Sequence, residues 1–385
     1  MKGKMYTRQQ NFAYAERNSF FFWGPRQTGK STLLKNRFKN SLVFDLLMFD
    51  VFQRFLRNPS LLREIILIEK PLEPVIIDEI QKIPALLDEI HWLIENTETQ
   101  FILSGSSPRK ILKQGVNLLG GRALRYELFP LSSTEIPDFN LIKALNSGLI
   151  PRHYDAKNSE ILLAAYIGSY LEDEIIAETK IRNAQVFSKF LEKAAFSNGE
   201  ILNYTNIASD CGVSGPVIKE YFNILNETML GSFVEVYKKK PKRRVISSPK
   251  FYLFDVGLVN FLLKRKNIEP GTESFGLAFE HFIYHEISCH SNYSGLNYPI
   301  RFWRTSSQLE VDFILGENEV AVEVKSTDNV QLRHLKGLKA FAEEYEVKHK
   351  IVVSNDSYPR LVGDIRILPW KQFIKMLWDG ELIGK

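Results

Sequence analysis

The chain has 385 residues and a net charge of +5. A chain of this length is too long for a single domain with one hydrophobic core, so two or three domains are expected. Hydrophobic residues make up 44% and charged residues 25% of the chain, a balance that excludes a largely disordered protein. No apolar run is long enough to cross a bilayer, and the two cysteines fit neither a disulfide framework nor a zinc site. We therefore expect a cytoplasmic protein with reduced thiols and no membrane partner.

The first 140 residues alternate short apolar runs with helical patterns. The apolar runs are SFFFWG, SLVFDLL, PVIIDE, TQFILSG and LRYELFPLS, and the helical patterns include STLLKNRFK and ALLDEIHWLIE. Alternation at this spacing is typical of strands that are joined by helices. It predicts an α/β domain over residues 1–140, with a parallel sheet covered by helices on both faces.

A glycine-containing loop follows the first of these strands. Residues 24–31, GPRQTGKS, fit the phosphate-binding loop pattern at every fixed position. Glycines let backbone N–H groups curl around phosphates, and the N-terminus of the following helix adds positive potential. Lys30 is expected to reach the β- and γ-phosphates, and Ser31 to help hold Mg²⁺. The predicted nucleotide-binding residues are Gly24, Pro25, Arg26, Gln27, Thr28, Gly29, Lys30, Ser31 and Thr32.

Two acids, Asp78 and Glu79, supply the second half of the predicted site. The apolar run 75–77 delivers both of them at the C-terminal end of a strand, where parallel sheets build their sites. Asp78 is expected to contact the Mg²⁺ shell, and Glu79 to polarise the attacking water. The expected ligands are therefore ATP and Mg²⁺.

Two further residues are candidates for the same site. Ser104 follows the next predicted strand, where it either senses the γ-phosphate or belongs to an ordinary serine-rich loop. Arg122 follows two glycines. It either stabilises the transferred phosphate, in its own chain or in a neighbouring subunit of a homo-oligomer, or it is a solvated side chain.

The order of these motifs carries a resemblance. GPRQTGKST, VIIDEIQKIP, FILSGSS and GGRALRYELFPLS together resemble the prokaryotic AAA-type ATPases that are fused to a C-terminal domain of unknown function. The resemblance implies an AAA-like fold and ATP hydrolysis, although a second sensor arginine has no evident counterpart here. It extends over nearly the whole chain, through segments at 170–175, 248–258, 275–283, 310–314 and 322–326.

The middle of the chain, residues 155–265, is predicted to be a helical region with a winged helix. Residues 207–214 indicate a helix, a glycine turn and a serine N-cap. The spacing of apolar residues in the next helix predicts that it buries Val217, Ile218, Tyr221, Ile224 and Leu225.

The predicted wing carries the excess of positive over negative charge in the chain. Residues 238–250 contain seven basic side chains and no acid, whereas the rest of the chain is slightly acidic. A localised basic segment indicates a localised anionic partner. The segment 238–244 therefore either grips nucleic-acid phosphates without sequence preference or is a solvated turn on a packing module.

The C-terminal region, residues 270–385, is predicted to be an α/β domain with the order helix, three strands, helix, strand. Period-two alternation places Val311 and Phe313 on one face of their strand and Asp312 on the other face. By the same rule, Glu323 and Lys325 lie on one face of the next strand.

A carboxylate on an apolar helical face precedes these strands. Glu280 shares that face with large apolar side chains, where its charge is costly unless it is paired or bound to metal. The order of elements, with Glu280, Asp312, Glu323 and Lys325, resembles the core of restriction-endonuclease-like nucleases. The resemblance implies that Asp312 and Glu323 bind Mg²⁺, that Glu280 completes the metal site, and that Lys325 positions or activates the water. Val311 stands where that family often has proline.

Two functions remain open from the sequence. The first is an ATPase that acts on nucleic acid and couples its nucleotide state to metal-dependent cleavage. The second is a nucleotide-dependent switch or assembly protein, in which the acidic residues form a structural ion-pair network and nothing is cut.

Overall fold

The described part of the chain forms two compact units. A computed structural model describes residues 4–109, 111, 119, 123–168, 183–239 and 243–384. The N-terminal unit consists of Met5–Leu131 and Glu227–Leu230, and the C-terminal unit holds the rest. The regions 155–265 and 270–385, for which separate domains are predicted, therefore lie together in the C-terminal unit, apart from residues 227–230. Among the described helices, none combines the length and the apolar character that crossing a membrane requires.

The N-terminal unit is built on a five-stranded sheet in the order β2-β3-β4-β1-β5, and every neighbouring pair in it is parallel. The predicted α/β domain with a parallel sheet is thus confirmed. Its strands are β1 (Ser19–Trp23), β2 (Val43–Asp45), β3 (Val75–Asp78), β4 (Phe101–Gly105) and β5 (Ala123–Glu127). Its helices include α1 (Lys30–Arg37), α2 (Phe49–Arg57), α3 (Leu61–Glu69) and α4 (Leu86–Asn96).

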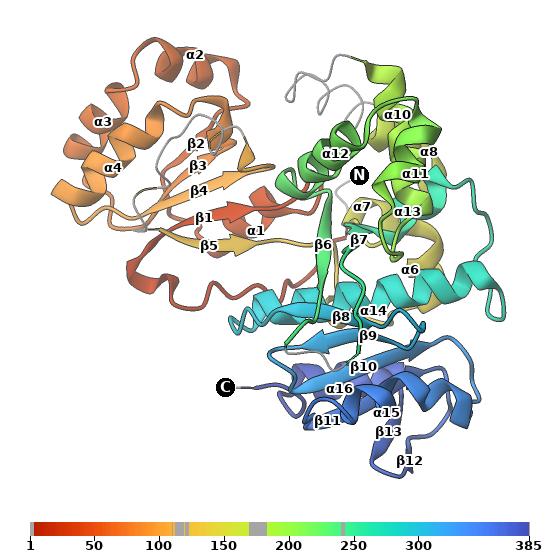
Figure 1. The fold of residues 1–385 in the computed structure, drawn as a ribbon. Helices are drawn as coiled ribbons and strands as arrows, with labels where there is room; N and C mark the ends of the chain where they lie inside the picture. The colour runs from red at the N-terminus through yellow and green to blue at the C-terminus, as the bar shows by residue number, and fades with distance from the viewer. Residues whose placement is uncertain are drawn as a thin grey trace. The chain divides into compact units, whose positions relative to one another are not determined.

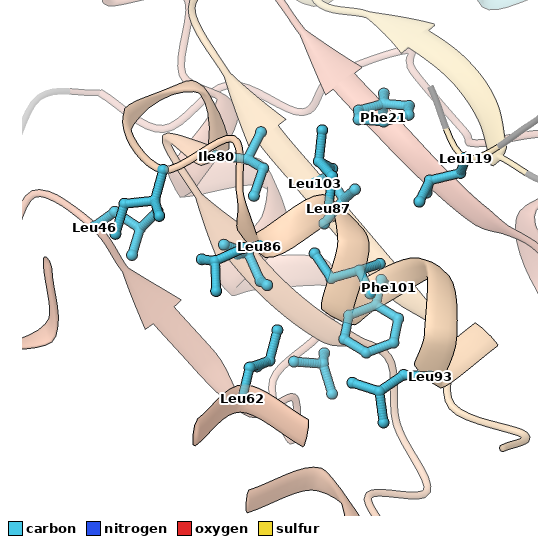
Figure 2. Packing of buried hydrophobic residues seen from close by; sticks show 14 of the residues in the cluster. Phe21, Leu46, Leu62, Ile80, Leu86, Leu87, Leu93, Phe101, Leu103 and Leu119 are labelled. Carbon is cyan, nitrogen blue, oxygen red and sulfur yellow. The ribbon is translucent and has the colours of Figure 1, made fainter. Parts of the chain in front are cut away.

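Successive residues of β1 pack into two different apolar groups. Phe21 and Trp23 belong to a buried cluster with residues of α2, α3 and α4, part of which Figure 2 shows. Phe20 and Phe22 instead lie against the ring of Phe12, at centroid distances of 5.0 Å. Because side chains alternate along a strand, β1 buries both of its faces, as expected of a strand that lies between β4 and β5.

The C-terminal unit begins with helices, several of which appear in Figure 1 in yellow-green and green. The predicted helix–turn–helix is present, because α11 (Tyr204–Cys211) ends at Gly212 with φ +70° and is followed by α12 (Gly215–Glu227). The predicted face of α12 is buried except for Val217, which is half-buried, and Phe222 joins it. The other helices here are α6 (Leu141–Ser147), α7 (Pro151–Asp155), α8 (Ser159–Tyr166) and α10 (Ala184–Phe196).

An eight-stranded sheet in the order β12-β13-β11-β10-β9-β8-β6-β7 forms the rest of this unit. Its strands are β6 (Gly231–Val236), β7 (Lys250–Leu253), β8 (Ile300–Arg304), β9 (Glu310–Leu315), β10 (Val320–Lys325), β11 (His349–Ser354), β12 (Arg360–Val362) and β13 (Ile365–Pro369). Its helices are α13 (Val256–Leu262), α14 (Glu273–Tyr293), α15 (Lys336–Ala342) and α16 (Trp370–Trp378). The order α14, β8, β9, β10, α15, β11 is the predicted one.

The hairpin that was predicted to be the wing is part of this sheet. β6 pairs with β7 in antiparallel fashion, and it also pairs with β8 in parallel fashion. The end of β6 that leads to the tip, Glu235 and Val236, is therefore held by β8 of the C-terminal region. A local alternation pattern does not reveal this pairing. Residues 240–242, at its predicted tip, lie outside the described residues.

β9 contains an irregularity beside Asp312. Trp303 of β8 pairs with Val311, whereas Arg301 of β8 pairs with Ile314, so three steps along β9 lie opposite two along β8. Such an extra residue is a β-bulge, which bends a strand and re-aims its side chains.

The bulge makes the predicted alternation of β9 wrong. Val311 belongs to a core cluster with Phe341 of α15, whereas the ring of Phe313 stacks on Tyr284 of α14 at a centroid distance of 5.9 Å. The two side chains that were predicted to share one face therefore pack against different helices.

Candidate functional site

The phosphate-binding loop joins β1 to α1 and depends on two of its glycines. A Cβ atom on Gly24 would lie 2.4 Å from the carbonyl oxygen of Leu128, so only glycine allows this approach of the two backbones. Gly29 has φ +98° and is the N-cap of α1, a conformation that side chains disfavour. The loop therefore turns tightly, and the backbone N–H groups at the N-terminus of α1 point to the space where an anion would bind.

The ammonium group of Lys30 is buried within this loop. Its Nζ donates hydrogen bonds to the carbonyl oxygens of Gly24 at 2.6 Å and Pro25 at 3.1 Å. Burial lowers the pKa of Lys30 to about 8, against the raising effect of the carboxylates of Glu79 and Asp78. The charge is thus held at a cost, which an anionic ligand at the loop would relieve.

Ser31 and Asp78 meet as the sequence predicts. The Ser31 hydroxyl donates to Asp78 Oδ2 at 2.6 Å, while the buried Oδ1 of Asp78 has no hydrogen-bond partner in the described chain. Ser104 lies directly beside Asp78 in the sheet, and its buried hydroxyl is likewise unpaired within the described residues. Hydroxyl and carboxylate oxygens at one point are the ligands that Mg²⁺ prefers, so these residues fit that ion.

The remaining predicted residues of the loop surround this core. Thr28 is buried and donates from Oγ1 to the carbonyl oxygen of Pro25 at 2.8 Å. Arg26 is half-buried, whereas Gln27 and Thr32 are exposed. Arg122, the candidate that would stabilise the transferred phosphate, lies outside the described residues.

Sequence reasoning missed two residues of this site. Arg8 donates from Nη1 to the carbonyl oxygen of Thr28 at 2.6 Å and from Nη2 to that of Phe129 at 2.7 Å, which ties the loop to the end of β5. Gln81 donates from Nε2 to Glu79 Oε2 at 2.5 Å. Gln81 could have been predicted from its position two residues after Glu79, whereas nothing in the local sequence pattern marks Arg8.

The four predicted residues of the C-terminal region are brought together. Glu280, Asp312, Glu323 and Lys325 line one cavity of about 570 Å³ in the C-terminal unit. Lys325 Nζ lies 2.6 Å from Glu323 Oε1, and Asp312 Oδ2 accepts a hydrogen bond from the backbone N–H of Val324 at 2.7 Å. The expected juxtaposition of these side chains is therefore present, despite the bulge in β9.

A second lysine, which sequence reasoning missed, lies among these acids. Lys250 of β7 is 3% exposed, and its Nζ lies 2.7 Å from Glu310 Oε1, 3.4 Å from Glu280 Oε1 and 4.0 Å from Asp312 Oδ1. Burial lowers the pKa of Lys250, but the three carboxylates outweigh burial and raise it above its ordinary value. Tyr252 also donates to Glu280 Oε1, at 2.6 Å. Glu280 is thus already paired.

The charge of Glu323 is less well compensated than that of Glu280. Glu323 Oε2 is buried and finds no hydrogen-bond partner in the part of the chain that the structure describes. Burial, together with the negative charge of Asp312, raises the pKa of Glu323 well above its usual range, against the lowering effect of Lys325.

The predicted metal ligands therefore divide into two sets. Among the described residues, no group of three or more His, Cys, Asp or Glu side chains is placed to hold a metal ion. Glu280 is engaged by Lys250 and Tyr252. Asp312 and Glu323 are the remaining predicted ligands; their oxygens fit a divalent cation, which would have to find its other ligands elsewhere.

Comparison with known protein families divides the chain into three stretches. Residues 16–137 match the AAA domain family, residues 139–269 a domain of unknown function (DUF8612), and residues 275–373 another domain of unknown function (DUF4143). The N-terminal unit is an AAA-like P-loop domain. Its loop, its Lys30 and its Asp78 are the features on which nucleotide binding by such a domain depends.

Two mycobacterial proteins are similar to most of the chain. Uncharacterized protein Mb2031c of Mycobacterium bovis and Uncharacterized protein Rv2008c of Mycobacterium tuberculosis are each 24% identical to it over 321 residues. The matched part covers 79% of this chain and 69% of each relative.

Two solved structures are weakly similar in fold. The Walker-type ATPase PABY2304 of Pyrococcus abyssi has a TM-score of 0.45 and 14% identity, over 66% of this chain and 93% of that one. The ORC1 protein of Aeropyrum pernix in complex with DNA has a TM-score of 0.25 and 11% identity, over 65% of this chain and 87% of that one.

Substitution of Lys250 tests how much the acidic cluster depends on its ammonium group. We expect Lys250→Met to lower the free energy of unfolding by about 3–5 kcal/mol, because it leaves buried carboxylates without their cation. Urea unfolding followed by circular dichroism measures this change. Lys219→Met, at an exposed position on α12, is the matched control and should change stability by less than about 0.5 kcal/mol. Equal stability of both variants would mean that Lys250 does not neutralise the cluster.

Proposed function

We propose that this chain binds ATP with Mg²⁺ and hydrolyses it at the site formed by residues 24–32, Asp78 and Glu79. The observation that carries the proposal is the convergence of the buried Lys30 ammonium and the Ser31–Asp78 hydrogen bond at the N-terminus of α1. Lys30 would bind the β- and γ-phosphates, Ser31 and Asp78 would hold Mg²⁺, and Ser104 would contact the γ-phosphate. Mg²⁺ offsets the charge that develops on the phosphates. Glu79 would accept a proton from the attacking water, and Arg122 would stabilise the transferred phosphate.

Two substitutions separate nucleotide binding from hydrolysis. Lys30→Ala should weaken ATP binding roughly 10- to 140-fold, because a charge-assisted contact of about 1.5–3 kcal/mol is lost. Glu79→Gln should keep the affinity and lose turnover, because an amide cannot accept the proton. Titration with a fluorescent ATP analogue and a phosphate-release assay measure the two quantities. Lys35→Ala, at an exposed position on the same helix, is the control. Turnover by Glu79→Gln at the wild-type rate would exclude Glu79 as the proton acceptor.

We further propose that the C-terminal unit binds nucleic acid and cleaves it with a divalent cation. The order of its elements and the cavity that holds Asp312, Glu323 and Lys325 support a restriction-endonuclease-like fold with this chemistry. Asp312 and Glu323 would hold the cation, Glu280 would complete the site, and Lys325 would position or activate the water.

One observation favours the alternative, a nucleotide-dependent switch with a non-catalytic C-terminal domain. Lys250 and Arg304 already pair with acids of the cluster, since Arg304 Nη1 lies 3.0 Å from Glu310 Oε2. A structural domain needs such internal neutralisation, whereas a metal site needs carboxylates that remain available.

Metal binding and cleavage decide between these two functions. Mn²⁺ or Mg²⁺ should raise the melting temperature of the nucleotide-free protein in proportion to its occupancy, and Asp312→Ala should abolish both this shift and cleavage. Lys325→Ala should retain the shift, because an ammonium group is not a metal ligand, yet lose cleavage. The assays are thermal unfolding and nicking of plasmid, single-stranded DNA and RNA, with and without ATP. Asp328→Ala, at an exposed position, is the control. If wild type shows neither a shift nor cleavage, the switch function stands instead.

The basic segment 238–244, which follows the predicted helix–turn–helix of a winged helix along the chain, is the proposed nucleic-acid contact. Lys238 and Arg244 are exposed. Arg243, in contrast, lies 2.6 Å from Glu344 Oε1 and 2.5 Å from Glu343 Oε2, so its charge is largely offset. The expectation that all basic residues of the segment are available to phosphates therefore does not hold for Arg243.

The salt dependence of binding tests this contact. Replacing the basic residues of the segment by glutamine should flatten the plot of log K against log salt by about 0.9 for each phosphate contact that is lost on duplex DNA. Arg243→Gln alone should leave the slope nearly unchanged, since its guanidinium already serves two glutamates. Fluorescence anisotropy with a duplex at several salt concentrations measures the slope. The residues to replace are Lys238, Lys239, Lys240, Lys242, Arg243 and Arg244, with exposed Lys35 and Lys39 replaced as control. An unchanged slope would assign the hairpin to packing alone.

A further inference from the structure

A single buried amide joins Glu79 to the loop that follows β4. Gln81 is 3% exposed, and its Nε2 donates to Glu79 Oε2 at 2.5 Å and to Ser106 Oγ at 3.0 Å. Both hydrogens of the amide are therefore used, one on the carboxylate and one on a hydroxyl. Ser106 itself is buried just beyond the end of β4.

The backbone around this amide is shaped to admit it. Glu79 has φ +60°, a left-handed conformation that is uncommon for a residue other than glycine and that clusters at functional sites. A Cβ atom on Gly105 would lie 2.2 Å from Gln81 Oε1 and 2.5 Å from the ring of Trp23. The absence of a side chain at Gly105 thus provides the space that the amide of Gln81 occupies.

The amide group of Gln81 uses its N–H donors but leaves its carbonyl oxygen without a hydrogen bond from the described residues. Gln81 Oε1 is buried and lacks a hydrogen-bond partner among the described residues. Burying an unpaired carbonyl oxygen opposes folding, so a purely apolar side chain of the same size would serve packing better. The amide therefore contributes through its N–H donors, which bind Glu79 and Ser106.

We propose that Gln81 is a positioning residue of the ATP site. By donating to Oε2, it holds the carboxylate of Glu79 in one orientation and leaves Oε1 to accept the proton of the attacking water. By donating to Ser106, it makes that orientation depend on the loop beyond Ser104. This inference rests on the proposed role of Glu79 in ATP hydrolysis.

The loop is itself anchored on its far side, within the same unit. Ser107 Oγ donates to the carbonyl oxygen of Glu227 at 3.3 Å, and the buried Arg109 forms an ion pair with the carboxylate of Glu227. These contacts fix the loop that carries Ser106, and with it the partner that Gln81 uses to hold Glu79.

Kinetics of Gln81→Met test the proposal. This variant keeps the volume of the side chain and removes the donor. We expect kcat for ATP hydrolysis to fall by about tenfold or more, because the general base loses its orientation, while the Kd for ATP stays within about threefold. Ser106→Ala should lower kcat by a smaller factor at unchanged Kd. Gln53→Met, on α2, is the control and should match wild type in both quantities.

A double-mutant cycle distinguishes positioning from structure. In the Glu79→Gln background, Gln81→Met should cause no further loss of kcat, because it acts only through the carboxylate. If Glu79→Gln turns over ATP at the wild-type rate, the proposed role of Glu79 fails. If Glu79→Gln loses turnover but neither Gln81→Met nor Ser106→Ala lowers kcat, the positioning role of Gln81 is wrong. Should Gln81→Met fail to fold, as judged by ATP affinity, Ser106→Ala decides alone.

Discussion

Parallel pairing of β4 with both β1 and β3 is the constraint on which the nucleotide site depends. Because all three strands run in one direction, their C-terminal ends lie at one edge, where Ser104 stands beside Asp78 on one side and Phe22 on the other. The phosphate-binding loop leaves β1 at this edge, and the two acids leave β3 there. With β4 between the two strands, the Ser31 hydroxyl at the start of α1 lies 2.6 Å from Asp78 Oδ2 at the end of β3.

Lys30 and Lys250 both bury their ammonium groups, and the structure compensates the two charges in different ways. The ammonium group of Lys30 bonds to backbone carbonyls, and burial lowers its pKa more than the carboxylates of Glu79 and Asp78 raise it. Lys250 lies among three carboxylates, which raise its pKa. An ammonium group that is poorly compensated suits an anionic ligand, whereas one that is well compensated suits a closed ion-pair cluster.

Local patterns predicted the elements well and their long-range partners poorly. The strands and helices around the phosphate-binding loop, the helix–turn–helix and the order α14, β8, β9, β10, α15, β11 all follow from apolar periodicity and turn residues. The bulge in β9 was missed, because an extra residue in one strand is visible only against its partner. The parallel pairing of β6 with β8 was missed for the same reason, since Glu235 and Arg301 are far apart in the sequence.

The sequence by itself determined the chemistry of the nucleotide site, because its loop, Lys30, Ser31 and Asp78 belong to motifs with fixed internal spacing. It also determined that Glu280, Asp312, Glu323 and Lys325 were candidates for one cluster. Only the tertiary structure decided what those groups touch. The ammonium of Lys250 and the amide of Gln81 reach acids and hydroxyls on other strands and loops. Contacts of this kind depend on how strands pair, and pairing leaves no mark on the periodicity of a single segment.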